Sequence, residues 1–294
     1  MQISSGKTFK LQPLVFQGPC KSNAINFRLL GKISAPDKNE WAENKKEKWV
    51  TFKEVNNLIV YGSGIIEGSG PTWWKDVESE RPTSLAFTSC DNLQLKSITS
   101  INSAKNHISI SSCIGVTIFD VTLIAPDDSP NTDGINIAGS SQVNLFDSFI
   151  GTGDDCVAIN GGCSGINITN VKCGPGHGLS VGSLGRNQVN EEVEHVYVKN
   201  CTFNGTQNGA RIKTVPTSAV EVSNVKFIGF HGSAIKEKAI KLNCSEVKGC
   251  NGIVLEDINI IPAIEGKNLE VVCNNASGTV QHTTPPVSCL VAKP

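Results

Sequence analysis

Two adjacent aspartates stand in the loop sequence GTGDDC, residues 151–156, with no basic residue beside them. Like charges held side by side hinder each other's ionisation, which raises the pKa of at least one of the two carboxyls. A solvated turn would account for the pair, because Asp favours turns and Gly supplies positive φ. Two carboxyls, one protonated and one ionised, could instead serve as general acid and general base.

Four short segments place polar residues at one repeated position. They are DGINI from Asp133, DCVAI from Asp155, HGLSV from His177 and NGARI from Asn208. Apolar residues coincide at the third and fifth places of these segments, and two of the intervals are 22 residues long. If 22 residues make one coil of parallel strands, then Asp133, Asp155 and His177 stack about 5 Å apart, with Asp154 beside the column.

Two cations belong to the same register. Arg211 and Lys213 take outward places where the preceding coils hold small or amide side chains. Three carboxylates, an imidazole, a guanidinium and an ammonium group on one face are more than a solvated turn explains. Each residue alone has an ordinary alternative: His177 could be a satisfied histidine, Lys213 a solvated charge, and Arg211 a counter-ion of Asp155.

An internal repeat indicates the fold that positions these residues. Eight segments carry apolar residues at their first and third places and a turn residue at the fifth; they begin at Leu58, Leu93, Val116, Val143, Ile166, Val196, Val220 and Ile253. Units this short cannot bury an apolar face alone, so they must stack, as in a right-handed single-stranded parallel β-helix. A β-sandwich, the alternative, would show hairpin turns at shorter intervals. We predict one all-β domain over residues 1–294.

Composition narrows the class of protein. The net charge of −1 predicts affinity for neither nucleic acid nor membranes, so an anionic partner must be held by a local cation cluster. Eleven cysteines suggest an oxidised, secreted glycoprotein, as do five glycosylation sequons, at Asn167, Asn200, Asn204, Asn243 and Asn275. The first residues do not read as a signal peptide, so we expect either a processed or a truncated chain. Cys90, Cys113, Cys163 and Cys201 fall at core positions of the repeat.

Four blocks resemble, in order and spacing, the signature blocks of the plant polygalacturonases, glycoside hydrolase family 28. They are NTDGI, GTGDDC, CGPGHGLSVGSLG and RIKT. The resemblance implies a pectin lyase-like β-helix that hydrolyses α-1,4-galacturonosyl bonds of de-esterified pectin with inversion. It further implies a monomeric enzyme of the plant cell wall, with polygalacturonate as its partner and with neither metal nor cofactor.

The same resemblance implies roles for individual residues. Asp154 resembles the general acid that protonates the leaving oxygen, and Asp133 with Asp155 resembles the pair that activates water. His177 would help to keep the acid protonated. Arg211, Lys213 and Asn131 would bind substrate. Inverting enzymes generally hold acid and base roughly 6.5–9.5 Å apart, which leaves room for water.

Disulfides are implied as well. By resemblance Cys156 pairs with Cys173, Cys244 with Cys250, and Cys273 with Cys289. Cys20 would normally pair with a cysteine nearer the amino terminus, and this chain has none there.

Two departures from the family pattern leave alternatives open. Relatives have an initial coil before SGKTFKL, and they have one to two further coils, carrying a substrate-binding tyrosine, after RIKT. Neither Tyr61 nor Tyr197 aligns with that tyrosine. One alternative is therefore a catalytically impaired, pectin-binding relative. Another is a calcium-dependent pectate lyase, which shares the β-helix, although His177 beside Asp154 and Asp155 suits acid–base work without metal.

Overall fold

The computed structural model describes residues 1–42, 47–76, 78–186, 191–215, 220–246 and 248–290. It divides into two compact units. The first consists of Met1–Gly182 and Glu192–Lys213, and the second of Ser183–Glu191 and Thr214–Pro294. Whether both form the single predicted domain stays a prediction. In the described part of the chain, no helix is long and apolar enough to cross a membrane.

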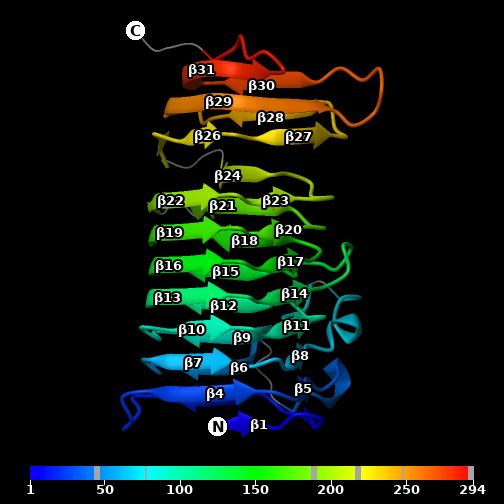
Figure 1. The fold of residues 1–294 in the computed structure, drawn as a ribbon, viewed down its shortest axis with the longest axis vertical. Coiled ribbons are helices and arrows are strands. Elements are labelled where there is room, and N and C mark those ends of the chain that lie inside the picture. Colours follow the sequence, from blue (N-terminus) through cyan, green and yellow to red (C-terminus); the bar gives the residue numbers. More distant parts are fainter. Residues whose placement is uncertain (43–46, 77, 187–190, 216–219, 247, 291–294) are drawn as a thin grey trace. The chain divides into compact units, whose positions relative to one another are not determined.

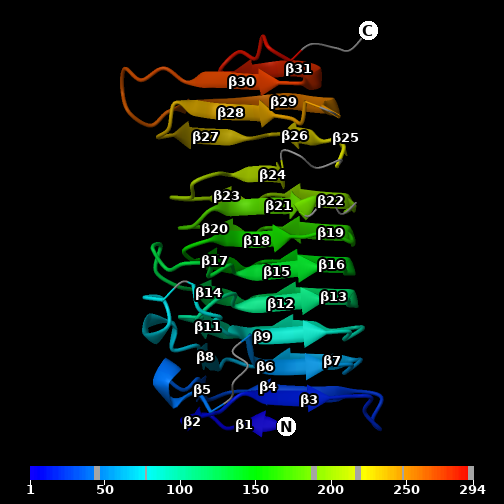
Figure 2. The same ribbon diagram turned by 180° about the vertical axis from the view of Figure 1, so that it is seen from behind.

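Three parallel sheets make up the first unit, and each described coil runs through the third, the first and the second sheet in turn (Figures 1 and 2). The first sheet contains β1 (Gln2–Ile3), β4 (Ile25–Leu29), β7 (Leu58–Tyr61), β10 (Gln94–Lys96), β13 (Ile114–Phe119), β16 (Ser141–Phe146), β19 (Cys163–Thr169) and β22 (Val193–Lys199). The second contains β2 (Thr8–Lys10), β5 (Lys32–Ser34), β8 (Ile65–Glu67), β11 (Thr99–Ile101), β14 (Thr122–Ile124), β17 (Phe149–Gly151), β20 (Lys172–Cys173) and β23 (Thr202–Phe203). The third contains β3 (Leu14–Gln17), β6 (Lys48–Lys53), β9 (Thr83–Thr88), β12 (Ile108–Ser111), β15 (Ile135–Ala138), β18 (Asp155–Ile159), β21 (Gly178–Leu184) and β24 (Ala210–Thr214). The predicted all-β parallel β-helix is confirmed.

The apolar repeat sets the register of the first sheet. Val116 pairs with Val143, Val143 with Ile166, and Ile166 with Val196. The first three of these side chains are fully buried. This is the alignment that the sequence predicted, and it arises because a slip of one residue would turn the apolar side chains outward.

The turn residue of each repeat adopts the left-handed conformation. Asp120, Asp147 and Asn170 have φ of 52°, 49° and 56°. Asp and Asn tolerate this region better than other residues with a side chain, so the fifth place selects them. Their side chains also bond between coils: the Asn170 amide donates to Asp147 over 3.0 Å, and Ser97 donates to Asp120 over 2.8 Å.

Small side chains fill one interior column, as predicted. Cys90, Cys113 and Cys163 are buried free thiols, and the Cys113 backbone N–H donates to the hydroxyl of Ser140 over 3.0 Å. Cys201 is a half-buried free thiol that packs against the same core. These cysteines act as small core residues.

The second unit has its own sheets and its own core. One sheet contains β25 (Val222–Ser223), β26 (Lys226–Ile228), β27 (His231–Ala234), β29 (Cys250–Pro262) and β31 (Ala276–Thr284). The other pairs β28 (Lys238–Asn243) with β30 (Glu270–Asn274). The predicted disulfides Cys244–Cys250 and Cys273–Cys289 are formed.

The predicted register is wrong in this second unit. The repeat aligned Val220 with Ile253, whereas Lys226 pairs with Val254, so the strands are shifted by five residues. The short strands β25, β26 and β27 all pair with β29 at one offset, with Val222 facing Cys250 and His231 facing Asn259, which is five residues less than the repeat predicted. A pattern of one short strand facing another cannot describe that arrangement.

Candidate active site

The third sheet brings six of the predicted residues to neighbouring coils of the first unit. Asp133 and His177 lie just before β15 and β21, and Asp154 precedes Asp155, the first residue of β18. Arg211 and Lys213 lie on β24. In parallel strands the same ends meet at one edge of the sheet, which is why residues distant in sequence come together here.

A β-bulge in β18 corrects the predicted column. Val157 pairs with Leu179 as expected, but Asp155 pairs with Gly178, so Cys156 is an extra residue on its strand. A bulge re-aims the neighbouring side chain, and it removes Asp155 from the place beside His177. His177 instead meets Asp154: its backbone N–H donates to the Asp154 carbonyl over 2.8 Å. The predicted disulfide Cys156–Cys173 joins this bulge to β20.

Asp155 is buried and held by two cations. Its Oδ1 accepts from Arg211 Nη2 over 2.8 Å and from the Ser180 hydroxyl over 2.6 Å, while Oδ2 accepts from Lys213 Nζ over 2.8 Å. Burial alone would raise the pKa of Asp155, but the hydrogen bonds from Lys213, Ser180 and Arg211 outweigh it and hold that pKa below its ordinary value. Asp155 is therefore the ionised carboxylate of the site. In this structure Arg211 does act as its counter-ion.

Asp154 is the more accessible partner, with its side chain 19% exposed against 4% for Asp155. Its Oδ1 lies 2.9 Å from His177 Nδ1 and accepts the Asp155 backbone N–H over 2.8 Å. Its Oδ2 accepts from the Asn131 amide over 3.3 Å. His177, the Asp155 backbone and Asn131 thus hold this carboxyl in place.

Asp133 carries the raised pKa. Its half-buried carboxyl accepts from the Asn136 amide over 3.2 Å. Burial, with the added charges of Asp154 and Asp155, raises the pKa of Asp133 to about 7. The sequence predicted that crowding would raise the pKa of at least one carboxyl, and the structure identifies it as Asp133. Between the lowered pKa of Asp155 and the pKa of Asp133 of about 7, Asp133 is thus protonated while Asp155 is ionised.

The carboxyls of Asp154 and Asp155 lie closer together than the roughly 6.5–9.5 Å that separates acid and base in most inverting enzymes. Asp154, Asp155 and His177 each have a ligand atom within 4.8 Å of the others. Such a set could hold a metal ion, but both oxygens of Asp155 already accept hydrogen bonds from cationic side chains. Arg211 and Lys213 therefore supply the positive charge that a metal would bring.

Sequence reasoning missed one further residue beside the site, Arg81. This arginine is 4% exposed, and its Nη2 donates to Asn131 Oδ1 over 2.6 Å. The sequence does give one indication of this residue: Arg81 comes directly before Pro82 and the buried strand β9. A charged side chain at such a position is rarely buried unless it has a specific partner.

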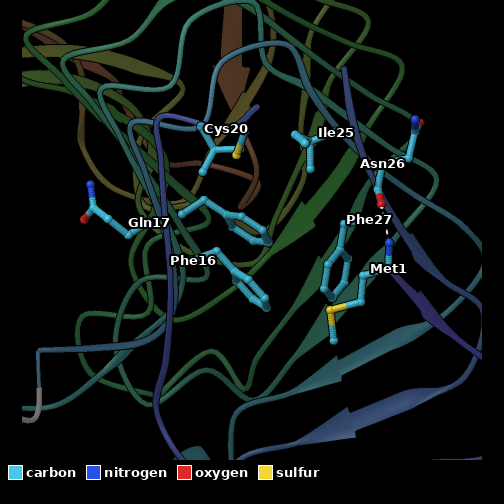
Figure 3. A pocket seen from close by; sticks show the side chains of 9 residues that line it. Met1, Phe16, Gln17, Cys20, Ile25, Asn26 and Phe27 are labelled. Atoms are coloured by element: carbon cyan, nitrogen blue, oxygen red, sulfur yellow. Dashed lines mark hydrogen bonds between the residues drawn. The ribbon is translucent and has the colours of Figure 1, made fainter. Parts of the chain in front are cut away.

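One pocket lies elsewhere in the first unit, on β3, β4 and β6 (Figure 3). It has a volume of about 160 Å³ and is lined mainly by apolar side chains, among them Phe16 and Phe27. Cys20, whose thiol is free and exposed, also lines it. None of the predicted site residues contributes to its wall.

Comparison with known proteins places this geometry in a family. The family model described as "Glycosyl hydrolases family 28" matches residues 1–236. A probable polygalacturonase of Arabidopsis thaliana is 40% identical over 331 residues, covering 98% of this chain and 72% of the relative. A polygalacturonase of Prunus persica is 35% identical, and the alignment covers 96% of this chain and 83% of the Prunus protein.

A solved structure agrees on the fold. The endo-xylogalacturonan hydrolase of Aspergillus tubingensis superposes with a TM-score of 0.78 at 20% identity, over 96% of this chain and 90% of that one. The Arabidopsis alignment is longer than this chain, so the relative carries residues without a counterpart here. The model match and the two relatives show that the chain belongs to family 28 of the glycosyl hydrolases.

Proposed function

We propose that this protein is a polygalacturonase that hydrolyses α-1,4-galacturonosyl bonds of de-esterified pectin. The observation that carries the proposal is the pair of opposite pKa shifts in one carboxylate cluster, raised to about 7 for Asp133 and lowered for Asp155. Acid–base hydrolysis needs one proton and one negative charge at the same site. The curated relatives named above are called polygalacturonases.

We assign proton donation to Asp154 and water activation to Asp133 with Asp155. Asp154 is the more exposed of the adjacent pair and lies beside His177, so it can reach a glycosidic oxygen. In the reaction, water attacks the anomeric carbon and loses its proton to the base carboxylate, while the leaving oxygen takes a proton from the acid. In the free protein the proton is on Asp133, so this assignment requires its transfer to Asp154 when substrate binds.

Inversion is supported by the bonding of Asp155. A retaining enzyme needs a carboxylate that can attack the sugar, but both oxygens of Asp155 are held by Arg211 and Lys213. We therefore expect the first product to carry the β-anomer, in contrast to the α-linkage of the substrate. Proton NMR of the reducing end, recorded before mutarotation, measures this; an α-anomer would contradict inversion.

Arg211 and Lys213 also support recognition of an acidic sugar chain. Each side chain is 28% exposed although it contacts Asp155, so a uronate carboxylate can approach the same cations. Three disulfides and the family's substrate support a secreted enzyme acting in the plant cell wall. We expect it to act as a monomer.

The decisive experiment compares substrates with different leaving groups. Asp154→Asn should lower the release of reducing ends from polygalacturonate by several orders of magnitude. The same variant should keep most of its activity on an aryl galacturonide, whose leaving group needs no protonation. Asp133→Asn should lose both activities. If Asp154→Asn hydrolysed polygalacturonate as fast as wild type, the proposal would fail; an unsaturated product would indicate a lyase instead.

A further inference from the structure

Arg81 is a buried cation directed at the loop that carries Asn131 and Asp133. Its Nη1 donates to the carbonyls of Pro130 and Ala104 over 2.6 and 3.2 Å, and its Nη2 donates to Asn131 Oδ1 over 2.6 Å. The fork of the guanidinium thereby holds both the backbone before Asn131 and the Asn131 side chain. Asn131 itself has φ of 53°, a conformation that Asn accepts.

These bonds fix which way the Asn131 amide faces. A guanidinium has donors and no acceptor, so the group that faces Arg81 must be the oxygen of the amide. The NH₂ group must then point the other way, where it donates to Asp154 Oδ2 over 3.3 Å. A flipped amide would place NH₂ against the guanidinium and an oxygen against a carboxylate, so both contacts would become repulsive.

We propose that Arg81 is a positioning residue of the active site, which orients the Asn131 amide as a hydrogen-bond donor to Asp154. This inference rests on the proposed function for its kinetic consequence. Arg81 does not touch substrate, because it is 4% exposed, and it acts only through Asn131. A hydrogen-bond donor to a carboxylate generally favours its charged form, so removing the donor hinders the release of a proton. Polarisation of the amide by the guanidinium strengthens that bond.

The first test is Arg81→Met, with kinetics on oligogalacturonate across pH. We expect kcat to fall about tenfold to a hundredfold, as for other residues that orient a reacting group, and KM to change little. The alkaline limb of the pH profile should move to higher pH, because the carboxyl cluster loses a group that favours its ionised form. Arg81→Lys should recover part of the rate, since one ammonium can reach one of the three oxygens that the guanidinium contacts.

Asn131→Asp separates positioning from folding. The new carboxylate can pair with Arg81 and keep the loop anchored, but it presents no donor to Asp154. We expect the thermal midpoint to hold while kcat falls at least as far as in Arg81→Met. Ser84→Ala is the matched control, because it removes a buried 2.8 Å bond to Ser103 on the segment beside Ala104. Its stability should fall while its kcat and pH profile stay those of wild type.

Two outcomes would overturn the inference. The double variant Arg81→Met with Asn131→Ala should be no slower than Asn131→Ala alone; a further drop of more than about threefold would mean that Arg81 acts by another route. Carbon-13 NMR titration of the Asp154 carboxyl gives a readout without substrate. If Arg81→Met leaves that titration unchanged, the orienting role is wrong, whereas inactivity of the wild type with an altered titration would fault only the proposed function.

Discussion

The carboxyls of the site differ through their neighbours rather than their type. Asp155 is the more deeply enclosed, yet its pKa is lowered, because Lys213, Ser180 and Arg211 all donate to it. Asp133 has one amide donor and two anionic neighbours, and its pKa is raised to about 7. Environment therefore separates the proton-holding carboxyl from the ionised one, which is the condition for acid–base catalysis.

The raised pKa of Asp133 makes a prediction about stability. A carboxyl with an ordinary pKa of about 3.9 when unfolded, and about 7 when folded, binds its proton more tightly in the folded state. Stability therefore falls as pH rises from about 4 to 7, and it levels off above that. Asp133→Asn should remove this loss. The free energy of unfolding of the variant, relative to that of wild type, should therefore increase as pH rises from about 4 to 7.

Urea unfolding at pH 4, 5.5, 7 and 8 measures the difference. Asp128→Asn, a change at an exposed carboxyl in the preceding loop, is the control and should track wild type. A difference between Asp133→Asn and wild type that is constant across these pH values would contradict the raised pKa.

The ion pair of Asp155 with Lys213 makes a prediction of opposite sign. The stability that comes from a lowered pKa is present above the unfolded value and is lost as pH falls through the folded value. Lys213→Met should cost about 1.5–3 kcal/mol near neutral pH, the worth of a hydrogen bond to a charged group, and less in acid. Lys172→Met, at an exposed lysine of β20, should cost little. An equal loss at pH 3 and pH 7 would show that Lys213 contributes packing rather than charge.

For single residues, the sequence predicted which side chains come together in the site but not all of the hydrogen bonds and ion pairs that they form. The stack of four segments identified every member of the carboxylate cluster. The pairing of Arg211 with Asp155 was only one of the readings considered, because register places side chains on a face without fixing their rotamers. Arg81 was missed since its partners are carbonyl and amide oxygens of a loop, which no strand periodicity reports.

At the scale of elements, one bulge decides how the catalytic strand presents its residues. The equal 22-residue intervals predicted a regular column and hide the bulge, because Phe149 and Asp155 face residues one place further along, Lys172 and Gly178, and the extra Cys156 restores the predicted pairing at Val157. The bulge separates the two aspartates: Asp155 faces Ser180 and the cations, and Asp154 faces His177. Two adjacent residues thus acquire different environments.

The disulfide beside that bulge should matter for stability. Cys156–Cys173 closes a loop with a sequence separation of 17, which includes β18 and β19. Replacing both cysteines by Ser should cost about 3 kcal/mol if the constraint acts on the unfolded chain, and kcat should fall because the bulge loses its anchor to β20. Chemical unfolding and rates on polygalacturonate measure the two effects.

A matched pair of substitutions shows whether the effect on rate is local. Cys244→Ser with Cys250→Ser removes a disulfide of the second unit, with a separation of 6. This variant should keep its kcat at temperatures where it is folded. Equal losses of kcat in the two double variants would refute a specific role for the Cys156–Cys173 bond.

At the scale of the whole chain, the sequence predicted the first unit well and the second one less so. Strands in the first unit face one partner on each side at a constant register, so an apolar repeat suffices to align them. In the second unit β29 spans three shorter partners at one common register, and the apolar repeat missed that register by five residues. The pairing of strands in the two units does not determine whether they unfold together as one cooperative domain or separately as two.

Core substitutions can decide that number. Leu145 is buried in the core of the first unit and Leu255 in that of the second, with exposures of 1% and 2%. Either leucine replaced by alanine should cost about 2–5 kcal/mol in its own core. If the chain is the single domain that we predict, Leu145→Ala and Leu255→Ala should both lower the temperature at which activity is lost. Differential scanning calorimetry with a parallel activity measurement tests this, and a loss of activity shifted by Leu145→Ala alone would show that the two units unfold separately.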